Sequence, residues 1–299
     1  MNTAVLLLAH GTPDTVSQIP EYMRNVTSGR PIPDSVIEEV AHRYSMIGHS
    51  PLTEITLRQG QLLSELLKMP VYVGMRNWRP YIAETVKRMR ADDVARVVAL
   101  CLAPQNSQTS VGLYRTAAYK EGTGMAIDFV ESWHDQPRLI AAFSERLRAA
   151  RASAGHATPI VFTAHSVPCR TIAAGDPYGR QARETAALVA RNLGLLDSQW
   201  VFAFQSQGIS GGPWIGPTVE DTLRYLKREG HSRALIQPVG FVCDHIEVLY
   251  DVDIHFREYG SQIGIETSRA ESLNDLPAFI SALADLVQAH LKKPWAAAL

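Results

Sequence analysis

The sequence predicts an α/β protein of two similar Rossmann-like domains, each a four-stranded parallel sheet flanked by helices. Apolar runs of strand length alternate with helical patterns along the whole chain, which is typical of β-α repeats and parallel sheets. A short motif also occurs twice, as Ala9-His10-Gly11-Thr12-Pro13 and as Ala164-His165-Ser166-Val167-Pro168, each time at the end of an apolar run. Two copies separated by about half the chain predict two similar halves.

Four predicted strands fall in each half, and helical patterns separate them. The strands of the first half span residues 4–9, 71–75, 94–103 and 125–130, and those of the second half span 159–164, 200–205, 233–242 and 262–266. Segments 54–68 and 180–194 carry the apolar spacing of helices between strands.

The boundary between the halves is expected in segment 144–158, which is rich in Arg, Ala and Ser and poor in large apolar residues. This placement gives an N-terminal domain at 1–148 and a C-terminal domain at 149–299. The tail 274–292 has apolar residues at helical spacing and Asn274 as its expected cap. We therefore expect a terminal helix that can pack across the boundary.

The composition is that of a globular protein and argues against several functional classes. Of the 299 residues, 46% are hydrophobic and 20% are charged, and the formal net charge of −1 lacks the basic excess of a nucleic-acid binder. No apolar run approaches the roughly 20 residues of a transmembrane helix, and run 4–9 is too short for a signal peptide. Three widely spaced cysteines supply neither a disulfide framework nor the four thiolates of an iron–sulfur cluster. We expect a monomeric cytoplasmic protein.

The two repeated histidines are the first candidates for chemistry. Open α/β sheets bind ligands beyond the carboxyl ends of their strands, and both His10 and His165 end a predicted strand. We expect the two side chains to line a shared cleft. The alternative is a strand-end histidine that only hydrogen-bonds to nearby backbone.

A second candidate follows the strand predicted at 233–242. Glu247, Asp251 and His255 recur at every fourth residue, so on a helix they form one stripe. Carboxylate and imidazole groups suit divalent iron or magnesium, and they can also accept protons. The alternative is an ordinary solvated acidic face.

Two further segments carry weaker signals. The loop 205–217 is rich in Gly and Pro but has no phosphate-binding motif, and its Trp214 could either stack on a flat ligand or anchor the loop. Segment 27–52 contains Arg30 and Arg43, and arginines near a cleft favour carboxylate ligands. Taken alone, each of these arginines is more typical of an ordinary surface position.

Taken together, six segments resemble the ferrochelatase family. They occur in family order and cover nearly the whole chain. They are residues 7–13 (LLAHGTP), 43–44 (RY) with 50–52 (SPL), 130–133 (VESW), 163–168 (TAHSVP), 213–217 (PWIGP) and 238–251 (PVGFVCDHIEVLYD).

Members of this family insert ferrous iron into a porphyrin. The resemblance therefore implies a porphyrin cleft between the domains, iron as a substrate, no tightly bound cofactor and no iron–sulfur cluster. It implies that His165 and Glu247 are the catalytic and metal-binding pair, and that Asp251 and His255 continue the line of metal ligands. The porphyrin-binding residues that it implies are His10, Arg43, Tyr44, Ser50 and Tyr114.

Within the family, the chain is most similar to the short bacterial enzymes that use coproporphyrin III. The resemblance implies Fe-coproporphyrin III as product, with handover to a downstream haem enzyme. His10 departs from that branch, which has a tyrosine that binds the product iron there, and Asn77 stands where relatives often have histidine. His255 replaces a usual carboxylate. Because imidazole also binds iron, His10 is expected to be an axial ligand of the product.

Three other functions stay open at this point: the same reaction on protoporphyrin IX, a cobalt or nickel chelatase for another tetrapyrrole, and a non-catalytic haem carrier. For iron insertion we expect His165 to bind iron or accept a pyrrole proton, with Glu247 as its partner. Either role needs a neutral imidazole, so activity should fall as the pH drops through the pKa of His165.

Overall fold

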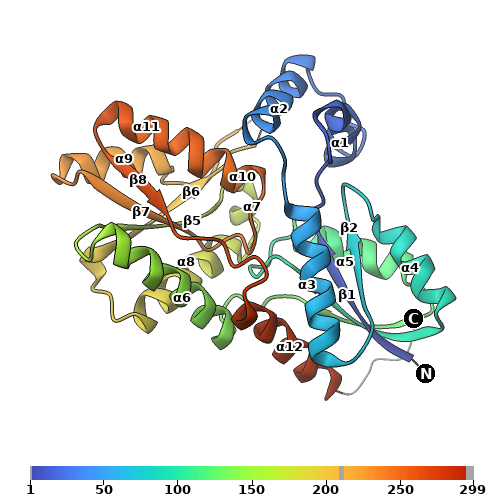
Figure 1. The fold of residues 1–299 in the computed structure, drawn as a ribbon. Coiled ribbons are helices and arrows are strands. Elements are labelled where there is room, and N and C mark those ends of the chain that lie inside the picture. Colours follow the sequence, from blue (N-terminus) through green and yellow to red (C-terminus); the bar gives the residue numbers. More distant parts are fainter. Residues whose placement is uncertain (1, 209–211, 294–299) are drawn as a thin grey trace. The chain divides into compact units, whose positions relative to one another are not determined.

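The computed structural model describes residues 2–208 and 212–293, which form two compact units (Figure 1). Unit 1 contains residues 2–103, 109–133 and 279–293, and unit 2 contains residues 104–108, 134–208 and 212–278. The position 148–149, where the sequence places the domain boundary, lies inside helix α6 (Pro137–Ala154) of unit 2.

Unit 1 is built on a parallel four-stranded sheet with the strand order β2-β1-β3-β4. Its strands are β1 (Asn2–Ala9), β2 (Val71–Met75), β3 (Val94–Cys101) and β4 (Ala126–Val130). The central strand β1 is buried from Ala4 to Ala9, as expected for a parallel strand that is covered by helices on both faces.

The helices of unit 1 cover both faces of this sheet. Helices α4 (Ile82–Ala91) and α5 (Val111–Glu121) close one core with β1 and β3, and α3 (Leu52–Leu67) packs against β2. Beyond the carboxyl end of β1 lie the short turn η1 (Val16–Gln18) and the paired helices α1 (Ile19–Val26) and α2 (Asp34–Ile47) (Figure 1).

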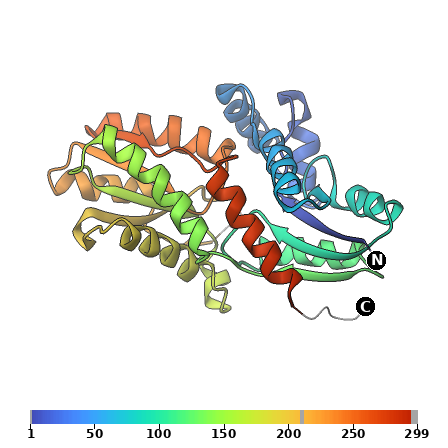
Figure 2. The same cartoon turned by 60° about the horizontal axis from the view of Figure 1, so that its bottom comes forward.

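The terminal helix α12 (Pro277–Leu291) leaves unit 2 and packs in unit 1. The Phe279 ring stacks on Trp133 with the ring centroids 6.1 Å apart. Near the other end, His290 Nδ1 lies 2.7 Å from Asp128 Oδ2, so the helix reaches β4 (Figure 2).

Unit 2 repeats the topology of unit 1, with the strand order β6-β5-β7-β8. Its parallel strands are β5 (Ile160–His165), β6 (Trp200–Gln205), β7 (Arg233–Pro238) and β8 (Glu266–Arg269). Helices α6 and α8 (Tyr178–Asn192) pack together on one face, and α9 (Val219–Arg228) and α11 (Phe256–Ile263) on the other (Figure 1). The shorter elements are α7 (Cys169–Ala173), η2 (Asp197–Gln199), α10 (Ile246–Leu249) and the π-helical turn η3 (Asp251–His255).

The predicted fold class is confirmed by these two parallel four-stranded sheets flanked by helices. The expected cleft between the units stays a prediction. The strand predicted at 262–266 is wrong, because α11 extends to Ile263 and Gly264, with φ +76°, ends the helix before β8 begins at Glu266. Asn274 is not a helix cap, because it precedes α12 by three residues and its side chain pairs with Asp244.

Candidate active site

At the carboxyl end of the unit 2 sheet, an ion pair joins His165 to Glu247. His165 is the last residue of β5, and Glu247 lies in the first turn of α10, which follows β7. His165 Nε2 lies 3.3 Å from Glu247 Oε1, and the side chains are 30% and 34% exposed. The other ring nitrogen of His165, Nδ1, hydrogen-bonds to the Ser166 carbonyl, so the expected backbone contact coexists with the carboxylate contact.

A second histidine completes the surroundings of the Glu247 carboxylate. His245 Nε2 lies 3.5 Å from Glu247 Oε2, and its Nδ1 lies 3.1 Å from the Cys243 carbonyl oxygen. The ring of Phe241 packs against His245, with the centroids 4.5 Å apart, and also against His165. Glu247 is therefore held between two imidazoles, each with an aromatic neighbour.

The charges of this cluster are strongly coupled. Burial lowers the pKa of His165, but the charge and hydrogen bond of Glu247, aided by the Ser166 carbonyl and Asp251, raise it from 6.5 to about 9. Burial raises the pKa of Glu247, whereas His165 and then His245 lower it well below its ordinary value. At neutral pH the proton therefore resides on His165, and Glu247 is ionised.

Residues at the end of β6 fix the start of α10. Gln205 Nε2 donates a 2.7 Å hydrogen bond to the Glu247 carbonyl, while its Oε1 accepts from the Thr163 hydroxyl at 2.6 Å. Ser206 donates its hydroxyl to the buried carboxylate of Asp251. These contacts connect the neighbouring strands β5 and β6 to the segment that carries Glu247 and Asp251.

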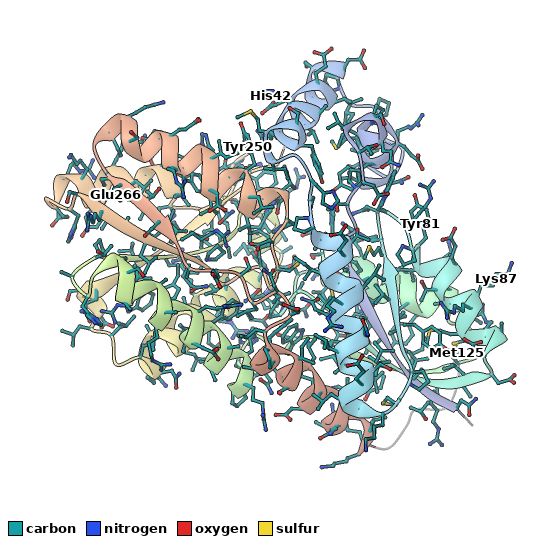
Figure 3. All side chains as sticks on the ribbon, viewed as in Figure 1. His42, Tyr81, Lys87, Met125, Tyr250 and Glu266 are labelled. Atoms are coloured by element: carbon teal, nitrogen blue, oxygen red, sulfur yellow. The ribbon has the colours of Figure 1, made fainter. Side chains whose placement is uncertain are left out.

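The predicted acidic stripe does not follow a regular helix. After α10, the His255 amide donates to the Tyr250 carbonyl five residues earlier, at 2.9 Å, which is the hydrogen bond of a π-helix (Figure 3 labels Tyr250). Asp251 lies close enough to His165 to raise its pKa. The exposed His255 instead pairs with Glu220 of α9, with Nε2 and Oε1 3.0 Å apart.

Arg269, the last residue of β8, forms ion pairs with both ends of segment 244–253. Its Nε and Nη2 each lie 2.8 Å from a carboxylate oxygen of Asp253, and Nη1 lies 3.2 Å from Asp244 Oδ1. Asp244 also accepts hydrogen bonds from Ser272 and Asn274. The guanidinium thereby holds the two ends of segment 244–253 close together, and this segment contains His245, Glu247 and Asp251.

In unit 1, His10 directly follows β1 and lies in a polar and aromatic cluster. Its Nε2 is 2.9 Å from the Tyr22 hydroxyl, and the Asn77 amide nitrogen lies 3.0–3.1 Å from the two ring nitrogens. The ring of Tyr22 packs in turn against those of Tyr44 and Trp78. Gly11 has φ +80°, and a Cβ there would lie 2.9 Å from Trp78, so the turn after His10 requires glycine.

The other predicted porphyrin-binding residues lie in different parts of unit 1. Tyr44 is buried and joins the His10 cluster through Tyr22. Ser50 is buried ahead of α3, and Tyr114 is buried on α5. Arg43, one residue earlier on α2, forms an ion pair with Glu39.

In unit 2, residues 209–211 of the predicted loop 205–217 lie outside the described residues. Trp214 follows them, and its ring centroid lies 6.3 Å from that of His165. The Ile215 amide beside it donates to the Val167 carbonyl at 3.0 Å, which fixes this part of the loop against the segment after β5.

No group of three or more His, Cys, Asp or Glu side chains that could hold a metal ion occurs among residues 2–208 and 212–293. The metal-binding roles predicted for His165, Glu247, Asp251 and His255 stay predictions. Separately, none of the helices in the described ranges has the length and apolarity needed to cross a membrane.

Sequence reasoning missed His245, Gln205 and Arg269. His245 is two residues from Glu247, a spacing that puts side chains on different faces of a helix. It reaches Glu247 because it precedes α10 in an extended conformation, with φ −165°. Gln205 is the last residue of β6 and pairs in register with His165. Its position at the end of a predicted strand is the sequence feature that could have identified it.

Comparison with known proteins identifies the family to which the chain belongs. The Ferrochelatase family model matches residues 2–291. A ferrochelatase of Acidobacterium capsulatum is 56% identical, with 97% of this chain and 95% of that protein covered. A coproporphyrin III ferrochelatase of a Geobacillus species is 35% identical, with coverage of 96% and 97%.

Solved structures show the same fold at low sequence identity. The SirB structure from Bacillus subtilis with Fe3+ aligns with a TM-score of 0.62 and 10% identity, covering 98% of this chain and 96% of that one. CbiX, described as the terminal enzyme of sirohaem biosynthesis in denitrifying bacteria, aligns with a TM-score of 0.54 and 14% identity, covering 97% and 99%. The family match over nearly the whole chain and the identity with curated relatives show that this protein belongs to the ferrochelatase family.

Proposed function

We propose that this chain inserts ferrous iron into coproporphyrin III to give Fe-coproporphyrin III in haem biosynthesis. The observation that carries the proposal is the Glu247 carboxylate between His165 and His245, in a chain of the ferrochelatase family. Relatives that are 34–36% identical and are named coproporphyrin III ferrochelatases support this substrate.

Insertion of Fe2+ must release both pyrrole protons, because the metal takes the place of two N–H hydrogens. In the proposed reaction, the approaching cation lowers the pKa of His165, whose proton leaves to solvent. Neutral His165 and ionised Glu247 then either bind iron or accept one pyrrole proton each. His165 and Glu247 give iron few protein ligands, so the four porphyrin nitrogens can compete for the metal.

Asp251 supports this site by electrostatics. Its buried carboxylate stabilises the protonated form of His165 and so favours reprotonation of this imidazole after each turnover. Asp251 and His255 are proposed as points where iron binds on its way to Glu247. His10 is proposed as the axial ligand of the product iron, with Tyr22 and Asn77 orienting its ring.

The surroundings of the reaction are part of the proposal. We propose a monomer that acts in the cytoplasm without a tightly bound cofactor and hands its product to a downstream haem enzyme. Within unit 1, the residues proposed to bind the porphyrin are His10, Arg43, Tyr44, Ser50 and Tyr114.

The test is to offer coproporphyrin III and protoporphyrin IX separately with Fe2+ under anaerobic conditions and to follow the Soret band. The proposal expects a higher kcat/KM for coproporphyrin III. A higher value for protoporphyrin IX would make that porphyrin the substrate. Haem binding without any insertion would instead indicate a carrier, and insertion of Co2+ or Ni2+ but not Fe2+ would indicate a different chelatase.

A further inference from the structure

Arg76 lies at the carboxyl end of the unit 1 sheet, beside His10. It follows β2 directly, and its amide donates to the Ala9 carbonyl at 3.0 Å. The next amide, that of Asn77, donates to the His10 carbonyl at 2.9 Å. Arg76 is therefore fixed where open parallel sheets bind their ligands.

The Arg76 side chain extends across the strand ends. Its guanidinium carbon lies 5.2 Å from the centroid of the Tyr114 ring on α5, and it is close enough to Cys101, the last residue of β3, to affect that thiol. Because β1 lies between β2 and β3, the side chain passes over the end of the central strand. Its Nε is buried and has no hydrogen-bond partner in the described part of the chain.

The positive charge of Arg76 is not neutralised by its neighbours. Within the described residues, no ion pair with an Asp or Glu involves Arg76, and its neighbours Tyr114 and Cys101 are uncharged at neutral pH. Burial raises the pKa of Cys101 to about 12, and burial also raises the pKa of Tyr114 far above its ordinary value. A half-buried cation without a counter-ion costs free energy, and an anionic ligand would remove that cost.

Two hydroxyl groups in the same region also lack partners. Thr12, which follows β1, and Ser50, which precedes α3, are 2% and 1% exposed. Neither side-chain oxygen has a hydrogen-bond partner among the described residues. The Thr53 hydroxyl lies 3.4 Å from the Thr12 carbonyl, which connects the start of α3 to the end of β1. This end of unit 1 thus has two hydroxyl groups without hydrogen-bond partners as well as the cationic side chain of Arg76.

We propose that Arg76 binds a propionate carboxylate of the tetrapyrrole substrate, with Tyr114 holding the guanidinium in place. A guanidinium presents paired N–H donors that match the two oxygens of a carboxylate, and stacking on an aromatic ring leaves these donors available. This inference rests on the proposed function, because it takes a porphyrin as the ligand. It adds a carboxylate contact that does not involve Arg43.

The test measures binding of coproporphyrin III to the full-length protein by fluorescence titration, without metal. Arg76→Met should raise Kd about tenfold to a hundredfold, since a charged hydrogen-bonded pair is lost. Arg76→Lys keeps the charge without the paired donors and should fall between wild type and Arg76→Met. Arg88→Met removes the same charge from an exposed side chain of α4 and should leave Kd unchanged.

A second ligand separates carboxylate recognition from a general loss of structure. The tetramethyl ester of coproporphyrin III, presented in detergent micelles, has no carboxylate, so Arg76→Met should weaken its binding much less. An equal loss for both ligands, or a Kd equal to that of Arg88→Met, would overturn the inference while leaving the proposed function intact. If the wild-type protein inserts no iron into either porphyrin, the proposed function fails instead.

Discussion

The carboxylate of Glu247 lies 3.3 Å from Nε2 of His165, so the end of β5 and the first turn of α10 meet in one ion pair. The repeated motif places a histidine at the end of the first strand in both units, but this carboxylate partner belongs to unit 2. In unit 1 the neighbours of His10 include the neutral side chains of Tyr22 and Asn77. The two copies of the motif have therefore acquired different chemical surroundings.

The pKa of His165 predicts an alkaline pH dependence. The pKa is raised from 6.5 to about 9, so the imidazole is protonated at neutral pH and becomes neutral as the pH approaches 9. We expect kcat to rise between pH 6.5 and about 9. In Glu247→Gln the remaining activity should show an inflection nearer 6.5, because burial lowers the pKa of His165 and only the weaker effects of the Ser166 carbonyl and Asp251 then oppose it. An inflection of kcat at pH 6.5 in the wild-type protein would contradict the claim that Glu247 raises the pKa of His165.

The same shift predicts how stability depends on pH. A histidine whose pKa is higher in the folded protein contributes stability that is complete below about pH 6.5 and is lost as the pH rises through 9. Urea unfolding between pH 6 and 9.5 should show this loss in the wild type. The loss should be smaller in His165→Asn, which cannot be protonated.

Replacement of His245 tests the second contact of Glu247. His245→Asn removes one of the two imidazoles that lower the pKa of Glu247. We expect kcat to fall by about tenfold, less than for loss of His165, because a single general acid–base group contributes roughly 10²–10⁴ and His245 acts through Glu247. Its Kd for coproporphyrin III should stay within about twofold of wild type. A kcat equal to wild type would exclude this positioning role.

Arg269 is expected to be important for stability. Its side chain is only 14% exposed and pairs with Asp253 and Asp244, so Arg269→Met leaves two carboxylates without their partner. Removal of one partner of such a pair costs about 3 kcal/mol in the free energy of unfolding. Arg233→Met, which breaks the exposed pair with Glu266, should cost less than about 1 kcal/mol (Figure 3 labels Glu266). Urea unfolding curves of the two variants distinguish these outcomes.

The turn after His10 gives a prediction with a matched glycine control. Gly11 and Gly29 both have positive φ, but a Cβ lies 2.9 Å from Trp78 only at Gly11 and meets nothing within 4 Å at Gly29. Gly29→Ala should cost about 1 kcal/mol from backbone strain, whereas Gly11→Ala should cost more and should also weaken porphyrin binding. Equal unfolding free energies for the two variants would show that the approach to Trp78 has no effect.

Hydrophobic patterning was sufficient to predict most of the fold. The apolar runs at 4–9 and 159–164 became central strands because parallel strands are buried on both faces. The prediction failed at 262–266, where Ile263 and Ile265 resemble a short strand but Gly264 separates a helix from β8. A single glycine in the left-handed conformation decided that boundary.

The site was predictable only in part, for a different reason. His165 and Glu247 stand in specific motifs, and the structure brings them together. The contact of His245 with Glu247 depends on an extended residue before α10, and the divergence of His255 from the stripe accompanies a π-helical turn. Neither backbone feature follows from residue spacing. The charge balance around Arg76 likewise depends on which side chains the fold brings together.

The most direct test of the central claim is the rate of anaerobic Fe2+ insertion into coproporphyrin III by His165→Ala. The account predicts a fall of at least about a hundredfold in kcat, because the acceptor or ligand on the metal side is lost. The Kd for the porphyrin should change by less than about threefold, since the porphyrin contacts are assigned to unit 1. Insertion by His165→Ala at close to the wild-type rate would contradict the account.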